Sequence, residues 1–240
     1  IVAMGLWIAA LSAGLPLGGD YGAVAWHGHE MLFGFGAAVL AGFLMTAIPN
    51  WTGQMPLSGP SLGALAALWL AGRLAMAGAA WIGLPLAVAI DVLFLPVLVA
   101  VCARELIAGQ KWKDMKVLGG VTLIALANLG YHAEVVLTGA PDVSTRAALA
   151  GFVLLVMIIG GRIIPSFTRN WLVARGATRM PVPFGRADGV AIVAALAALV
   201  VWVVAPEGPA AAGAGLAGAA IIAWRLSRWC GARTWREPLI

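Results

Sequence analysis

The sequence has few charged residues for its length. Asp, Glu, Lys and Arg make up 10% of the 240 residues, whereas hydrophobic residues make up 62%. A water-soluble fold of this size cannot bury so much apolar surface, so we expect lipid to surround most of the chain. The shortage of charge therefore excludes an ordinary soluble domain.

Signatures of soluble enzymes are also missing. There is no Gly-rich phosphate loop, no nucleophile elbow and no metalloprotease helix motif, which disfavours soluble kinase or hydrolase chemistry. The two cysteines, Cys102 and Cys230, are expected to be free thiols near a reducing face. The net charge of +5 does not indicate a nucleic-acid partner, because the basic residues lie in short loops between apolar runs.

What the sequence does contain is a series of apolar runs of about 20 residues, each enough to cross a ~30 Å hydrocarbon layer as a helix. The runs are continuous rather than alternating, which favours helices over a β-barrel. We predict an all-α fold, a polytopic transmembrane helix bundle with about eight spans in this chain. It forms a single integral membrane domain over 1–240, with a truncated first span. The expected spans are 1–16, 27–48, 62–81, 84–104, 117–138, 146–164, 188–205 and 210–227.

Lys and Arg gather in three places that an eight-span path puts on one side of the membrane. They are the loop 104–116, the loop 162–186 and the C-terminal end from Arg225 to Arg236. By the positive-inside rule this side is cytoplasmic, in a multi-pass membrane protein.

Two histidines and a glutamate open the second span, at what the topology makes its outer end. At 100° per residue, His27 and Glu30 share a face with the small residues that mark helix packing, so both are expected to point into the bundle. His29 lies about 200° from His27 on the same helix, which makes it the less favoured of the two histidines.

The third histidine lies at the outer end of the fifth span. By helical spacing His132 shares a face with Asn128 and Tyr131, whereas Glu134 does not join them. All three histidines of the chain therefore converge on one level near the outer face.

Neutral imidazole at the end of a membrane helix is a ligand for haem iron or copper, and a nearby carboxylate or phenol can fix its tautomer. The alternative is that the histidines are interfacial anchors bonded to backbone or headgroups. Ionisable groups in spans are costly and usually functional, so a metal or haem site is favoured. The candidate ligands are His27, His29 and His132, and the candidate supporting residues are Glu30, Asn128 and Tyr131.

Arg73 and Asp91 lie at similar distances from the turn near Gly83, on neighbouring spans. On an antiparallel hairpin both would be roughly 13 Å below the outer boundary, where an ion pair is far cheaper than two lone charges. Structural pairing is favoured over a proton or ion relay.

A second polar cluster is expected on the inner face, after the sixth span. Pro165 is predicted to stop that helix, and Arg162 and Arg169 could clamp an anion or a haem propionate. Positive-inside anchoring with a tryptophan belt is the alternative.

Three stretches of the sequence closely resemble the NnrS family: HGHEMLFGF at 27–35, GFLMTAIPNWTG at 42–53 and GRIIPSFTRN at 161–170. The resemblance implies a polytopic bacterial inner-membrane protein associated with haem and copper and with the nitric oxide response of denitrifying or NO-stressed cells. Family members have about twelve spans by the same length rule, so the chain looks like a fragment lacking the last ones. Its ends, Ile1 and Pro238–Ile240, suggest the same.

Three functions follow as hypotheses. The first is a haem- and copper-binding membrane protein that lowers nitric oxide toxicity, by binding NO or by limiting iron-nitrosyl damage. The second is a small-molecule or ion transporter or channel that uses Arg73, Asp91 and Glu30 inside the spans. The third is a structural subunit of a respiratory or denitrification complex.

Overall fold

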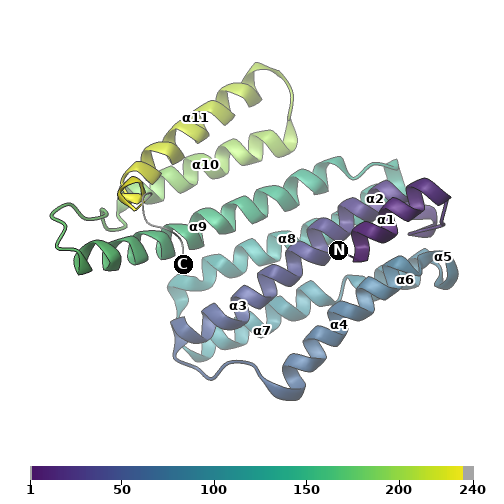
Figure 1. Cartoon of the computed structure of the whole chain (residues 1–240). Helices are drawn as coiled ribbons and strands as arrows, with labels where there is room; N and C mark the ends of the chain where they lie inside the picture. Colours follow the sequence, from purple (N-terminus) through teal and green to yellow (C-terminus); the bar gives the residue numbers. More distant parts are fainter. Residues whose placement is uncertain (1, 235–240) are drawn as a thin grey trace. The chain divides into compact units, whose positions relative to one another are not determined.

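The computed structural model describes residues 2–234, which form helices and no strand. This confirms the all-α prediction (Figure 1). Arg236 and Pro238–Ile240, which entered the predictions above, lie outside the described residues. The α-helices are α1 (Val2–Ala13), α2 (Ala23–His29), α3 (Ala37–Thr52), α4 (Gly59–Ala77), α5 (Ala79–Ile82), α6 (Leu84–Asp91), α7 (Phe94–Ala108), α8 (Met115–Thr138), α9 (Asp142–Ala174), α10 (Arg186–Val204) and α11 (Gly208–Ser227). A π-helical segment, η2 (Glu30–Gly36), joins α2 to α3, and the 3₁₀ turns are η1 (Gly19–Tyr21), η3 (Trp112–Asp114) and η4 (Gly231–Arg233).

Seven helical segments among the described residues are long and apolar enough to cross a membrane. They are Ala23–Thr52, Gly59–Ala77, Leu84–Ala108, Trp112–Thr138, Asp142–Ala174, Arg186–Val204 and Gly208–Ser227. The first predicted span appears as α1, whose 12 residues rise only about 18 Å, too short for a hydrocarbon layer of ~30 Å. The polytopic bundle is therefore confirmed with seven crossing segments and one short helix.

Two helices continue through prolines: Pro165, which was predicted to stop its helix, and Pro49, which directly follows the predicted span 27–48. Pro49 is in α3, which continues to Thr52 and ends at Gly53 in a left-handed conformation with φ of 73°. Pro165 is in α9, which runs on to Ala174. The prediction was wrong because transmembrane helices tolerate proline where neighbouring groups satisfy the freed backbone.

The chain divides into two compact units, of which one ends at Gly151 and the other begins at Phe152. The helix α9 runs through this boundary, and the single-domain expectation stays a prediction. In the first unit α7 packs against α3 and α8, and α4 packs against α6. In the second unit α10 packs along α11.

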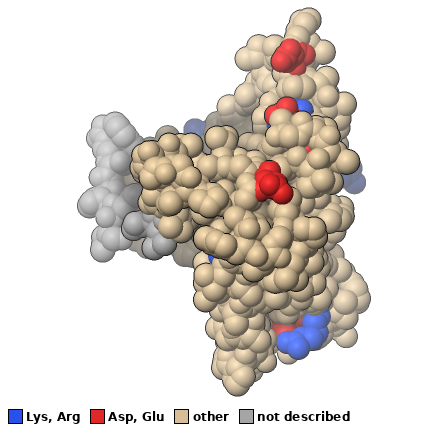
Figure 2. Space-filling view, turned by 90° about the vertical axis from the view of Figure 1, so that its right-hand side faces the viewer, with Lys and Arg blue, Asp and Glu red and all other residues tan. Residues whose placement is uncertain are grey.

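Large apolar side chains remain exposed along the crossing segments, as expected for surfaces that face lipid. Phe35, Leu137 and Phe167 are 65%, 80% and 70% exposed. Figure 2 shows one face of the molecule on which charged residues are few and separated by wide uncharged areas. Several polar residues are instead buried inside the helix packing, among them His29, Asp91 and His132.

Candidate metal centre

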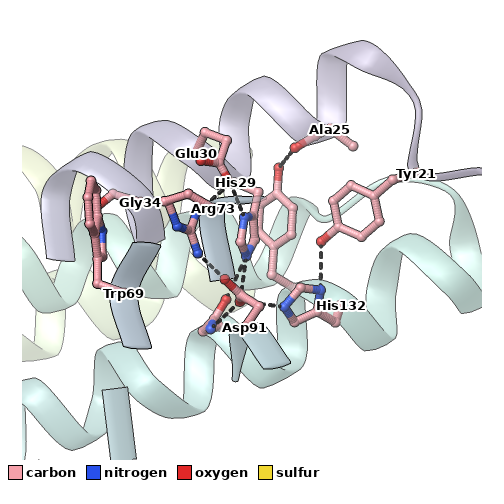
Figure 3. Close-up of polar contacts among 11 residues, drawn as sticks. Tyr21, Ala25, His29, Glu30, Gly34, Trp69, Arg73, Asp91 and His132 are labelled. Atoms are coloured by element: carbon pink, nitrogen blue, oxygen red, sulfur yellow. Dashed lines mark hydrogen bonds and ion pairs between the residues drawn. The ribbon is translucent and has the colours of Figure 1, made fainter. Parts of the chain in front are cut away.

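A buried polar cluster lies in the first unit, where residues from six helical elements meet (Figure 3). Its members are Tyr21 of η1, His29 at the end of α2, Glu30 at the start of η2, Arg73 of α4, Asp91 at the end of α6, and Asn128, Tyr131 and His132 of α8. The side chain of His29 is fully buried, and Asp91 is 1% exposed. Such a concentration of polar groups inside membrane helices indicates a functional site.

Asp91 lies at the centre of the cluster. Its Oδ2 accepts hydrogen bonds from Asn128 Nδ2 and His132 Nε2, both at 3.0 Å, and lies 3.2 Å from His29 Nε2. Its Oδ1 forms an ion pair with the Arg73 guanidinium. Both oxygens of the carboxylate therefore have polar partners, which is how a buried charge is tolerated.

A break in the third crossing segment sets the position of Asp91. The helix α6 ends at Asp91 and α7 begins at Phe94, because Pro96 has no N–H to donate to the carbonyl of Val92 four residues earlier. A discontinuous helix is tolerated inside a membrane only where it is covered by protein or lines a polar site. Here the break directly follows Asp91, whose carboxylate is buried in the interior.

The π-helical segment η2 starts directly after His29, in the first crossing segment, and its first residue is Glu30. Short π segments inside helices often occur at functional sites. Gly34 in this segment accepts a hydrogen bond from Trp69 Nε1 at 3.0 Å. A Cβ on Gly34 would lie 2.8 Å from Arg73 Nη1, so a larger residue would require the guanidinium to move.

Arg73 bridges two carboxylates from different helices. One guanidinium nitrogen pairs with Glu30 and another with Asp91. His29 Nδ1 lies 3.3 Å from Glu30 Oε1, and its Nε2 lies 2.9 Å from Asn128 Oδ1. Both ring nitrogens of His29 therefore lie near oxygen atoms of neighbouring side chains.

Tyr21 holds His132 from outside the crossing segments. Its hydroxyl lies 3.1 Å from His132 Nδ1, so it fixes the orientation of this ring. Burial raises the pKa of the Tyr21 phenol, which therefore keeps its proton. A hydroxyl can donate to Nδ1 or accept from it, so Tyr21 can support either tautomer of His132.

Three ligand atoms in this cluster could hold a metal ion. One each from His29, Asp91 and His132 lie within 4.8 Å of one another, and all three residues are buried. Two imidazoles and a carboxylate suit a first-row transition metal, among which Cu²⁺ is bound most tightly at nitrogen and oxygen sites. A porphyrin does not fit between the two imidazoles, because their ring centroids are only 4.7 Å apart and the rings are tilted at 44°.

The predicted orientations of the first two histidines are reversed in the structure. His29 points into the cluster, whereas His27 lies outside it, stacked on Trp7 with ring centroids 4.0 Å apart. The prediction was wrong because it aligned the packing face by small residues. The buried face is shifted by one position, with Trp26 and Phe33 on it at 1% exposure each. Glu30 is buried, as predicted.

On α8 the shared face of Asn128, Tyr131 and His132 is buried, in line with helical spacing. Tyr131 donates from its hydroxyl to the Ala25 carbonyl at 2.9 Å and packs beside His29. Glu134 is outside this group, as expected, and accepts hydrogen bonds from the backbone N–H of Ser144 at the start of α9. Its role is to cap that helix.

Sequence reasoning treated the Arg73–Asp91 pair and the histidines as separate features, but the structure joins them. The signal was available, since the pair was placed roughly 13 Å below the outer boundary and His132 lies about 9 Å from the end of α8 at 1.5 Å per residue. Tyr21 was missed because it lies in a short 3₁₀ turn with no helical period. Arg162 and Arg169 belong to the second unit and are exposed.

Comparison with known proteins gives one result. The family model described as NnrS protein matches residues 1–240. No curated protein and no solved structure matches the chain.

Proposed function

Because the chain belongs to the NnrS family, we propose that it acts in the nitric oxide response as a copper-binding membrane protein with His29, Asp91 and His132 as ligands. The family makes it an NnrS-type nitric oxide response protein. The copper site is supported chiefly by one observation, the meeting of three buried ligand atoms from α2, α6 and α8 within 4.8 Å.

The two imidazoles and the carboxylate of the cluster are suitable ligands for copper, and the negative charge of the carboxylate favours a cation. Imidazole nitrogen is a good ligand for copper, and a carboxylate adds charge compensation. The proton that His29 Nε2 shares with Asp91 and Asn128 occupies the place that a metal ion would take, because metal ligands must be deprotonated. Bound copper would supply an open coordination position for a small neutral ligand such as nitric oxide.

The remaining cluster residues hold the ligands in place. Arg73 occupies Asp91 Oδ1, which leaves Oδ2 directed at both histidines. Asn128 donates to the same Oδ2, and Tyr21 orients the His132 ring through Nδ1. Such supporting groups typically change metal affinity by about 10- to 100-fold when they are removed.

Haem, which the family resemblance implies, does not fit the buried cluster, as the spacing of the two imidazoles excludes it there. We propose His27 as the candidate axial ligand for haem among the described residues. Its ring is held against Trp7, and its buried Nδ1 has no hydrogen-bond partner. An otherwise unsatisfied buried ring nitrogen is a feature that ligand binding would explain.

We place the copper site near the outer face of a bacterial inner membrane, on the positive-inside argument. Nitric oxide is small and uncharged, so it can reach a buried site through lipid. The transporter and structural-subunit hypotheses are not favoured by the family match. Arg73, Asp91 and Glu30 are engaged with one another in the cluster, which suits a fixed site better than a relay.

Metal analysis of the purified chain tests the proposal. We expect about one copper per chain in the wild type, a loss of most copper in His29→Ala and His132→Ala, and little change in His27→Ala, the matched control outside the cluster. Cells that depend on the protein should lose nitric oxide tolerance with the first two variants.

Two results would contradict the proposal. One is equal copper in all four proteins, and the other is copper loss confined to His27→Ala. Because an alanine variant could misfold, Asp91→Asn provides a second check: it keeps the shape of the side chain but weakens the ligand. A haem band in reduced-minus-oxidised spectra that persists in His27→Ala would rule out His27 as the axial ligand.

A further inference from the structure

The second unit carries an unbalanced set of arginines that the proposed copper site does not explain. Residues 152–240 contain three acidic residues, Asp188, Glu207 and Glu237, and no lysine, and Glu237 lies with Arg236 outside the described residues. Glu207 precedes α11, whose 20 residues put it about 30 Å from the opposite end of that helix. The described arginines are Arg162, Arg169, Arg175, Arg179, Arg186, Arg225, Arg228 and Arg233.

Among the described residues, the acid that lies near these arginines is Asp188, and it is already engaged inside the unit. Asp188 is 3% exposed, and its Oδ2 accepts a hydrogen bond from Gly185 N at 3.0 Å. Its two oxygens lie 3.4 Å from Arg225 Nε and 3.4 Å from Arg228 Nη2. Asp188 therefore cannot neutralise the exposed arginines of the second unit, such as Arg169 and Arg179.

Helix lengths put the exposed arginines at the level of lipid headgroups. The helix α9 has 33 residues and rises about 50 Å, so its last turns project beyond a hydrocarbon layer of ~30 Å. Arg169 lies in these turns, and Arg179 lies in the loop that follows. Arg186 is the first residue of α10, which with 19 residues just spans the layer.

Tryptophans accompany the arginines at this end. The Arg175 guanidinium lies 3.8 Å from the centroid of the Trp171 ring, and that of Arg228 lies 4.8 Å from the Trp224 ring. Trp224 is 48% exposed. Tryptophan prefers the membrane–water interface, so the tryptophans and the arginines both place these residues at the level of the lipid headgroups.

We infer that Arg169, Arg179 and Arg186, here called the arginine-rich end, bind the phosphates of anionic phospholipid headgroups. All three side chains are exposed. Guanidinium forms paired hydrogen bonds with phosphate oxygens, and basic residues near the membrane are attracted to an anionic lipid surface. The surface thus prefers anionic lipid to zwitterionic lipid, independently of the metal site in the first unit.

Lipid retention measures this preference directly. The purified chain is reconstituted in bilayers of equal phosphatidylglycerol and phosphatidylcholine, and the lipids that stay bound after extraction are counted by native mass spectrometry. We expect enrichment of phosphatidylglycerol in the wild type and at least about a fivefold drop in Arg169→Gln/Arg179→Gln/Arg186→Gln.

The matched control removes three exposed basic residues from the first unit, as Arg104→Gln/Lys111→Gln/Lys113→Gln. It should keep most of the enrichment. Equal retention of both lipids by the wild type would overturn the inference, and so would an equal drop in the control, since that would reflect net charge alone. Thermal unfolding of both variants establishes that they are folded.

Discussion

At the scale of residues, Asp91 is the point on which the site depends. It receives hydrogen bonds from Asn128 and His132, contacts His29 and forms an ion pair with Arg73. Each partner is a donor, so the charge is compensated on every side. An acid this well surrounded can be kept 1% exposed within a membrane helix bundle.

Gly34 is expected to be indispensable to the site. In Gly34→Ala the new Cβ would lie 2.8 Å from Arg73 Nη1 and 3.0 Å from Glu30 Oε2, so the guanidinium must move. Overpacking of this kind costs about 1–3 kcal/mol. Thermal unfolding should show the loss, together with reduced copper content. Gly42→Ala is the control, because nothing lies within 4 Å of its Cβ, and an equal effect in both variants would contradict the account.

Arg73 is expected to be needed for stability as well as for ligand geometry. Arg73→Met leaves Glu30 and Asp91 without their shared cation, and breaking a buried pair from one side costs about 3–5 kcal/mol. Adding Glu30→Gln to this variant should recover part of the stability, since one of the two carboxylate charges is then removed. Denaturant or thermal unfolding in detergent would measure both. No recovery in the double variant would mean that packing, not charge, explains the loss.

The residue types of the site could be predicted from the sequence, but the ligand set could not. A helical-wheel projection correctly puts His27 and His29 on opposite faces of the helix. Only the packing of neighbouring helices decides which of these faces points into the bundle. Trp7 covers His27, and Asn128 meets His29, and both of these are long-range contacts. Tyr21 had no periodic signal at all because it sits in a turn.

At the scale of elements, irregular helices position the site. The helix α6 ends at Asp91, where the break before α7 begins, and the π-helical η2 follows His29 directly. The predicted span 84–104 ran through the first irregularity without a break, although Pro96 removes one helical hydrogen bond there. The sequence offered no sign of the second, because a π segment is specified by packing and hydrogen bonds such as Trp69 to Gly34.

The second unit has its own buried arginine, and a neighbouring glycine pair tests its role. Arg225 is 1% exposed and donates from Nη1 to the Met157 carbonyl at 3.0 Å. In Gly161→Ala the Cβ would overlap this guanidinium, whereas in Gly160→Ala its nearest neighbour is Ile164 Cδ1 at 3.7 Å.

We therefore expect Gly161→Ala to lower the unfolding temperature clearly, at a cost of at least about 1–3 kcal/mol, because α9 must shift away from α11. Gly160→Ala should be close to neutral or slightly stabilising, since alanine favours helix. Circular dichroism during heating measures both. Equal unfolding temperatures would show that Arg225 does not fix the distance between these helices.

At the scale of the whole molecule, composition alone predicted the fold class, and the expected spans match seven helical segments. This worked because lipid imposes length and hydropathy on every crossing helix. The sequence could not show that Arg73 and Asp91 lie beside the histidines. Similar depth in the membrane is not enough for contact, since contact also depends on which helices are neighbours. The orientation of the bundle follows from the basic loops and is still a prediction.

Thiol labelling in intact cells checks this orientation. With Cys102 and Cys230 replaced by serine, Lys111→Cys lies before α8 and Ala140→Cys lies after it, and both positions are exposed. A membrane-impermeant reagent added outside should label Ala140→Cys and spare Lys111→Cys, because the basic loop is expected to be cytoplasmic. The reverse labelling would invert the topology and move the metal site to the inner face.

The central claim is that His29, Asp91 and His132 bind a single copper ion, and electron paramagnetic resonance of the Cu²⁺-loaded protein tests it most directly. We predict one copper signal with hyperfine coupling to two imidazole nitrogens, reduced to one nitrogen in either His29→Ala or His132→Ala and unchanged in His27→Ala. A wild-type signal without nitrogen coupling, or one that both cluster variants leave unaltered, would contradict the account.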